Sequence, residues 1–191
     1  MACNINTGLT AVSCEQKEQA IGGFKPRLWV GNTDDIDSTA GIKGLTYDAN
    51  GNIDSIAFKA TKGLFVFNAN KDSVGATASR TRTEAGIPLY PQGITFKAFD
   101  ITAVQRTVLD DLAKADSLFA ILETSAGQFE VFGKDLGLVL GDANEKNYGA
   151  LRTDDTSSNI ALSSIGELSS PVPFLKTDYA TTLALIESYE V

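Results

Sequence analysis

The sequence predicts a mainly β fold: an antiparallel β-sandwich or barrel of about 8–10 strands, with one packed amphipathic α-helix and a long polar arm. Short apolar runs with period-two alternation recur along the chain and are separated by turn residues. Only residues 101–115 show a clear helical period. Residues 70–92 contain almost no large apolar side chain before Ile87, which is uncommon for a connection inside a compact domain.

The composition limits the classes of function. The chain of 191 residues suits one domain with an arm, and its 43% hydrophobic and 21% charged residues are ordinary for a globular protein. The net charge of −8 opposes binding to phosphate backbones, which depends on Lys and Arg. The chain has no histidine, which excludes Ser-His-Asp and Cys-His catalysis, histidine metal ligands and histidine pH switches.

Residues 1–25 are predicted to form an N-terminal arm. They contain Cys3 and Cys14, the two cysteines of the chain. Two thiolates cannot complete a tetrahedral zinc site, and free thiols are favoured over a disulfide, although the sequence leaves both redox states open. The arm lacks the basic and apolar regions of a signal peptide, and no apolar run reaches about 18 residues. We therefore expect synthesis in the cytoplasm and no membrane span.

Two loops that resemble metal sites are better explained as turns. Residues 45–60, "LTYDANGNIDSIAFKA", place Asn50-Gly51 between alternating apolar runs, which is a strong hairpin signal because a tight turn needs positive φ. The same stretch resembles a calcium loop, but isoleucine and lysine stand where that loop needs glycine and a bidentate glutamate. Residues 32–39, "NTDDIDST", also lack the ligand spacing. No metal site and no cofactor are predicted.

The arm of residues 70–92 has two interpretations. Its threonine-rich stretch "ATASRTRTE" suits an extended β-arm that pairs with another subunit, in which Arg80 and Arg82 point to the same side. A disordered loop explains the composition equally well. On the first interpretation the inter-subunit contacts come from four polar residues: Thr77, Arg80, Arg82 and Glu84.

The helix follows a strand at residues 93–99. Thr102 and Gln105 form a capping box, and one apolar stripe is expected to pack on a sheet. The stripe consists of Ile101, Val104, Val108, Leu112 and Ala115. Further strands are predicted up to residue 175, so residues 26–175 form the β domain. Residues 176–191 form a C-terminal tail segment, whose apolar spacing allows a short second helix.

The hairpin "SLFAILETSAGQFEVFG" (residues 117–133) holds the best catalytic candidates, Glu123 and Glu130. Retaining glycosidases use two carboxylates about 5 Å apart. However, Glu123 precedes the turn, where a side chain is usually hydrated. Glu130 alternates with Phe129 and Val131 and should face outward if they face the core. We therefore expect surface acids that line a lumen or a subunit seam, with no catalytic residue and no enzyme activity.

The central block resembles the tail-tube family of bacteriophages, whose relatives include head-to-tail joining rings. The residues that carry the resemblance are "GITFKAFDITAVQRTVLDDL", the hairpin with the strand after it, "SLFAILETSAGQFEVFGKDLGLVLG", and "SSNIALSSIGELSSPVPFL". By layout it extends from Trp29 to Leu175. The N-terminal wording "TAVSCEQKEQAIGGFKPRLWVGNTDDID" is similar to virion proteins of phages that infect Bacteroidetes, including crAss-like phages.

The resemblance implies a structural virion protein. Subunits would form a homo-oligomeric ring, 6-fold or 12-fold, and contact a neighbouring ring, the portal or other tail proteins. DNA would pass through the lumen without specific binding, and the arm would reach the next subunit. The location would be the tail or the head-to-tail connector of a virion assembled in the host cytoplasm. The alternative function is a ligand- or glycan-binding surface β-domain, such as an adhesin or a decoration protein.

Overall fold

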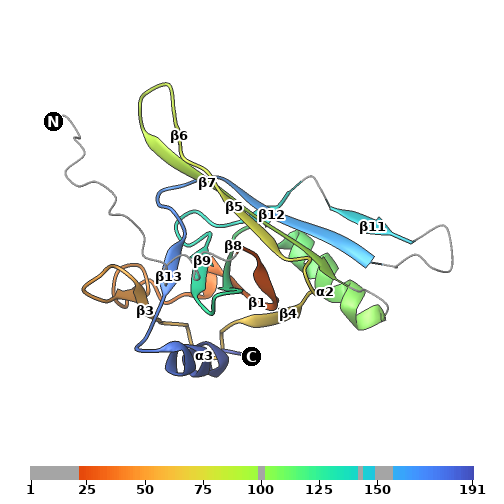
Figure 1. Cartoon of the computed structure of the whole chain (residues 1–191), viewed down its shortest axis with the longest axis horizontal. Helices are drawn as coiled ribbons and strands as arrows, with labels where there is room; N and C mark the ends of the chain where they lie inside the picture. Colours follow the sequence, from red (N-terminus) through yellow and green to blue (C-terminus); the bar gives the residue numbers. More distant parts are fainter. Residues whose placement is uncertain (1–21, 99–101, 142–143, 149–156) are drawn as a thin grey trace.

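A computed structural model describes residues 22–98, 102–141, 144–148 and 157–191, which form two stacked β-sheets and two α-helices (Figure 1). Both sheets are open in their strand order, so the fold is sandwich-like and the barrel alternative is wrong for this single chain. The described residues contain thirteen strands, more than the predicted 8–10, because several long runs are broken into short segments. Cys3, Cys14 and most of the predicted N-terminal arm lie outside these residues.

The larger sheet joins distant parts of the chain. Its order is β2 (Leu45–Tyr47), β3 (Ile53–Ile56), β13 (Val172–Phe174), β9 (Phe129–Phe132), β8 (Leu118–Thr124), β1 (Phe24–Asn32) and β4 (Phe65–Asn68). Neighbouring strands are antiparallel except β13 and β3, which pair in parallel at Phe174 and Ile53. A short 3-10 helix, η1 (Thr33–Asp35), follows β1.

The smaller sheet is built around two long strands. Its order is β10 (Val139–Leu140), β12 (Ser157–Glu167), β7 (Pro88–Ala98) and β5 (Gly75–Ala78), while β11 (Glu145–Asn147) pairs with β12 and β6 (Thr81–Arg82) pairs with β7. The β7–β12 ladder runs from Ala98 opposite Ser158 to Tyr90 opposite Glu167.

Strand β8 is buried on both faces, which explains its nearly continuous apolar sequence. Leu118, Ala120 and Leu122 face the smaller sheet and belong to what we call the inter-sheet core. Phe119 and Ile121 face the opposite side and belong to a second, outer core. The larger sheet is therefore the middle layer of the molecule.

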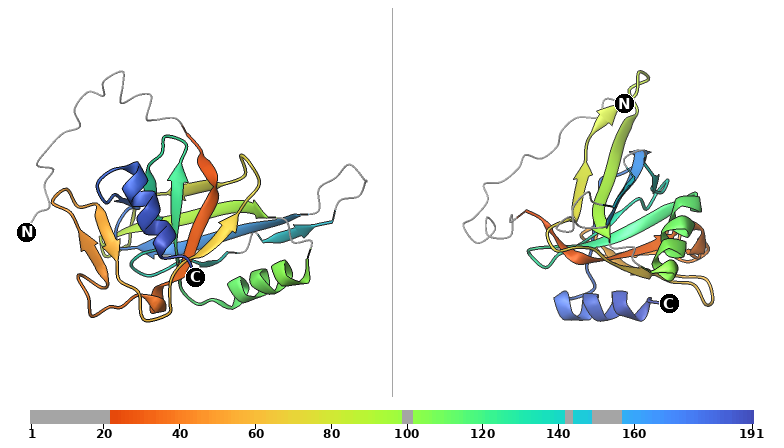
Figure 2. Two further views of the ribbon diagram at one scale, coloured as in Figure 1. Left: turned by 90° about the horizontal axis from the view of Figure 1, so that it is seen from below. Right: turned by 90° about the vertical axis from the view of Figure 1, so that its right-hand side faces the viewer.

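Helix α3 (Tyr179–Ser188) covers the outer core (Figure 2). The Asp178 carboxylate caps it by accepting the Thr181 N–H at 2.8 Å. Thr182 and Ile186 of this helix are fully buried. Most of the segment described as a tail in the sequence therefore forms a second α-helix that packs on the sheet.

Helix α2 (Ala103–Lys114) has the expected capping box between Thr102 and Gln105. The apolar stripe does not pack along its length, however. Leu112 is buried in the inter-sheet core, whereas Val104 and Val108 are 74% and 44% exposed. The expected packing is therefore correct only at the C-terminal end of the helix. Ile101 lies outside the described residues.

The Asn50-Gly51 turn joins β2 and β3 as predicted, with Gly51 at φ +87°. The Asp48 carboxylate accepts the backbone N–H groups of Asn50 and Asn52, both at 2.8 Å. The side-chain hydrogen bond from Asn52, together with these backbone hydrogen bonds, lowers the pKa of Asp48. This carboxylate therefore holds its own turn together.

Candidate assembly interface

The polar segment of residues 70–92 contributes to a protruding β-ribbon. Strands β5 and β6 both pair with β7 in one register, from Gly75 opposite Thr95 to Arg82 opposite Pro88. The two paired arms rise above the body of the molecule (Figure 2, right). We call residues 75–95 the ribbon. The segment is therefore extended β-structure and not an irregular loop, and the strand it pairs with in the structure is β7 of the same chain.

The tip of the ribbon is a tight turn between Thr83 and Ile87. The Gly86 N–H donates to the Thr83 carbonyl at 2.8 Å, and the Thr83 N–H donates to the Ile87 carbonyl at 2.9 Å. Gly86 has φ +79°, which fits a type I turn followed by a left-handed residue. The ribbon therefore ends in a defined hairpin.

The four predicted arm residues, Thr77, Arg80, Arg82 and Glu84, are all exposed on the ribbon. Strand alternation places Arg80 and Arg82 on the face that also carries Ala76, which packs against the inter-sheet core. Among the described residues, neither arginine has an ion-pair or hydrogen-bond partner. The ribbon thus presents two unpaired guanidinium groups beyond the core.

The hairpin carboxylates lie on opposite faces of the larger sheet. Glu123 is opposite Phe129 and Glu130 is opposite Leu122, and residues that face each other across a ladder share a face. Glu123 is buried, so its expected hydration near the turn is wrong. Its carboxylate accepts a hydrogen bond from Lys25, and this bond raises the pKa of Lys25. The two acids do not form a catalytic pair.

Glu130 lies on the face toward the smaller sheet. It is half-buried, and burial raises the pKa of its carboxyl. It lines a cavity of about 550 Å³ together with Ser79, Arg80, Ser170 and Pro171. The structure therefore brings one predicted arm residue and one predicted seam acid to the same cavity, at the base of the ribbon, while Glu123 lies elsewhere.

A second, larger hollow of about 720 Å³ lies between α2, the edge strand β4 and residues near the C-terminal end of the chain. We call it the groove. Exposed apolar side chains line it: Phe65, Val104, Val108 and Val191. Asp111 and Glu190 add acidic groups to the same lining. An apolar surface of this kind is typical of a site that another chain covers.

Strand β4 offers a free edge beside the groove. The Ala69 N–H donates to the Pro26 carbonyl at 2.8 Å, so these two residues form a hydrogen-bonded pair of the β4–β1 ladder. Because hydrogen-bonding pairs alternate, Val66 and Asn68 direct their main-chain groups away from β1. No strand in the described ranges pairs with β4 on that side, apart from the single bridge between Leu64 and Glu190.

The sequence signal for the groove was present but incomplete. The spacing of Val104, Val108 and Leu112 shows an apolar stripe without showing which part of it is covered. Val104 and Val108 are exposed because only the C-terminal end of α2 reaches the core between the sheets.

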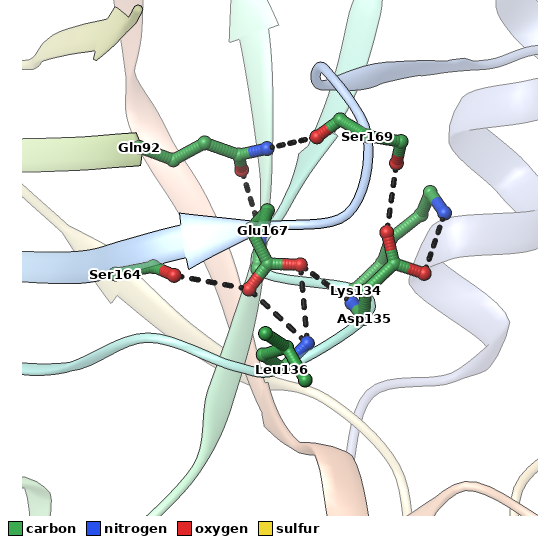
Figure 3. A network of polar contacts seen from close by, with 8 residues as sticks. Gln92, Lys134, Asp135, Leu136, Ser164, Glu167 and Ser169 are labelled. Carbon is green, nitrogen blue, oxygen red and sulfur yellow. Dashed lines mark hydrogen bonds and ion pairs between the residues drawn. The ribbon is translucent and has the colours of Figure 1, made fainter. Parts of the chain in front are cut away.

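A buried polar network stabilises the base of the ribbon (Figure 3). The fully buried Glu167 carboxylate accepts the Asp135 N–H at 2.8 Å, the Leu136 N–H at 3.1 Å and the Ser164 hydroxyl at 3.2 Å. The Gln92 amide bridges β9 and the turn after β12, accepting from the Gly133 N–H and donating to the Ser169 carbonyl, both at 2.9 Å. The network ties β7 and β12 to the segment that follows β9, which is a structural role.

Within the described ranges, no three or more Cys, Asp or Glu residues gather as metal ligands. None of the described helices has the length and apolar character needed to cross a membrane. No protein-family model, curated protein or solved structure matches this chain. The assignment of the interface therefore rests on the ribbon, the groove and the sheet edges.

Proposed function

We propose that this protein is a structural virion subunit that assembles into a ring or tube through which phage DNA passes, as a tail tube or a head-to-tail joining ring. The observation that carries the proposal is the ribbon. It extends beyond the core and ends in a defined turn, and its exposed arginines have no partner within the described part of the chain. A single subunit gains little from such a projection, whereas an assembly gains a contact.

The sheet edges support the same proposal. An open edge of unpaired N–H and C=O groups is a template for another chain, and closing a ring satisfies such edges. Strand β4 ends the larger sheet with such an edge. Pairing between neighbouring copies would continue the open sheet of one subunit into the next.

The charge distribution suits the passage of DNA. The net charge is −8 for the whole chain. Residues 75–95 contain Arg80, Arg82 and Glu84 as their charged groups, a net +1, so the remaining residues carry −9. A lumen wall built from these negatively charged residues would repel phosphate, so DNA would slide through the ring without being held.

Electron microscopy tests the proposal. Negative-stain images of the purified chain should show rings or tubes with a central hole, and light scattering should give a mass of many subunits. Replacing residues 82–88 by Asn-Gly removes the ribbon tip and should raise the protein concentration needed for assembly at least tenfold. The short turn fits because Thr81 and Leu89 form the pair that a two-residue turn can close. The midpoint of thermal unfolding should be unchanged, because the replaced residues are mostly exposed and β5 stays in place.

Glu145→Gln is the matched control, since Glu145 is exposed on β11, away from the ribbon. The control should assemble like the unmodified chain. A folded chain that remains monomeric at high concentration would overturn the proposal.

The alternative function, a ligand- or glycan-binding surface domain, is favoured by one feature. The cavity of about 550 Å³ at the base of the ribbon offers hydroxyl, guanidinium and carboxylate groups from Ser79, Ser170, Arg80 and Glu130. Such groups suit hydrogen bonds to a polar ligand. Glycan-array binding by a monomer or trimer, lost in Arg80→Ala, would select this function over the ring.

A further inference from the structure

We infer that the groove is the receptor for the ribbon tip of a second copy of this chain. The inference rests on the proposed self-assembly and adds to it the two surfaces that meet. The donor is the hairpin of residues 81–89, and the acceptor is the surface between α2 and β4.

The groove calls for an apolar occupant. Val104 is 74% exposed, Phe65 48% and Val108 44%, and all three line the same hollow. The ribbon tip supplies an apolar side chain of suitable size in Ile87, which is 55% exposed. Insertion of Ile87 between these side chains would remove apolar surface from water on both copies.

The donor and the acceptor also each have a strand edge with unpaired main-chain groups. Strand β6 pairs with β7 on one side, and its other edge is free within the described residues. Strand β4 has a free edge at Val66 and Asn68. Two free edges satisfy each other by strand addition, here over the two residues of β6 against the four of β4, and the side chains beside them set the specificity.

The charges of donor and acceptor are complementary. Arg80 and Arg82 project from the ribbon, while Asp111 and Glu190, which are ion-paired with Lys114 and Arg27, line the groove. The ribbon as a whole is net positive on an otherwise acidic chain, so a ribbon is attracted to the body of another copy more than two bodies are to each other.

Geometry favours a second copy over the same chain. Strand β6, at the upper left, and helix α2, at the lower right, lie far apart in Figure 1, and α2 lines the groove. Donor and acceptor are different surfaces, so the contact is head-to-tail. Such contacts generate closed rings when the rotation closes and filaments when it does not.

A mixing experiment tests this arrangement. One variant carries Val104→Asp with Val108→Asp, which charges the acceptor at two exposed positions, and the other carries Asn-Gly in place of residues 82–88. Each alone should raise the protein concentration needed for assembly at least tenfold. An equimolar mixture should form a 1:1 dimer and nothing larger, because one intact tip and one intact groove remain. Ile42→Asp, at an exposed site on the opposite end of the larger sheet, is the control and should assemble normally.

Cross-linking gives a second readout if the charged variant folds poorly. In a Cys3→Ser, Cys14→Ser background, Ile87→Cys with Val108→Cys should form intermolecular disulfides and a ladder on a non-reducing gel. Ile87→Cys with Ile42→Cys should not. Assembly that survives the charged groove, or a folded mixture without dimers, would overturn the docking but leave the ring proposal standing. An unmodified chain that stays monomeric would overturn both.

Discussion

At the scale of single residues, Glu130 shows how position sets chemistry. Its carboxylate is half-buried in the cavity that it shares with Arg80, and it accepts no hydrogen bond from any described residue. Burial raises the pKa above its ordinary value of 4.5. Between the ordinary pKa of the unfolded chain and the higher pKa of the folded chain, Glu130 has lost its proton in the unfolded chain but keeps it in the folded one. A rise in pH across this range therefore makes folding less favourable.

Glu130→Gln should therefore stabilise the fold at pH 7 but not at about pH 4, where Glu130 is largely protonated in both states. The gain should be less than about 1 kcal/mol, because solvent screens a half-exposed group. Urea unfolding of the variant with Asn-Gly in place of residues 82–88, measured at both pH values, avoids a contribution from assembly. The same change at exposed Glu145 is the control. Equal gains at both pH values would contradict the explanation.

The sequence predicted part of what these acids do. Alternation correctly separated Glu130 from Phe129 and Val131, but it assumed one buried face. The larger sheet has a core on each side, so the face opposite Phe129 is also partly covered. Burial of Glu123 depends on Lys25, which is 98 positions away in the chain, and no local pattern reports that contact.

At the scale of elements, α2 is a helix with one anchored end. The capping box fixes its start, and Leu112 holds its other end in the inter-sheet core. Its exposed half is maintained by the cap and by backbone hydrogen bonds. The anchored and exposed positions should therefore differ sharply in their contribution to stability.

Leu112→Ala should lower the free energy of unfolding by about 2–4 kcal/mol, because it leaves a cavity in the core. Val104→Ala should change it by less than about 0.5 kcal/mol, because the side chain is exposed. Urea denaturation of the two variants measures the difference. Similar losses for both would show that the whole stripe is packed. If α2 is the acceptor, Val104→Ala should still weaken assembly.

The elements were easier to predict than their arrangement. Period-two alternation, the Asn-Gly turn and the capping box are local signals, and the hairpins and α2 follow from them. The ribbon was ambiguous because its composition suits both a loop and an arm. Pairing with β7 resolves it, since β7 supplies the main-chain partners for β5 and β6. The points at which long predicted strands break into short ones, such as that between β5 and β6, have no local sequence signal.

At the scale of the whole molecule, the larger sheet is complete only when strands from distant parts of the chain are in place. Strand β13 lies beside β3 although about 120 positions separate Phe174 from Ile53, and α3 then covers the outer core. Sequence patterns describe neighbours along the chain and do not encode such pairings. This is why the last residues looked like a tail segment.

Residues 189–191 contact strands β1 and β3 and Leu64, the residue before β4. The Leu64 N–H donates to the Tyr189 carbonyl at 2.8 Å, and the Ile56 N–H donates to the Tyr189 hydroxyl at 3.3 Å. The indole N–H of Trp29, which is fully buried, donates to the Glu190 carboxylate at 2.8 Å. The outer core therefore depends on contacts made at this end of the described chain.

Deleting residues 189–191 should lower the free energy of unfolding by about 3 kcal/mol or more, because it removes a packed aromatic ring and leaves the buried Trp29 N–H without an acceptor. Trp29 is the one tryptophan of the chain, so its fluorescence should shift to longer wavelength as water reaches it. Glu187→Gln, which removes an ion pair with Arg27 between partly exposed side chains, should cost less than about 0.5 kcal/mol. An unchanged emission maximum and midpoint in the deletion would mean that the outer core closes without these contacts, and that helix α3 alone seals the sheet.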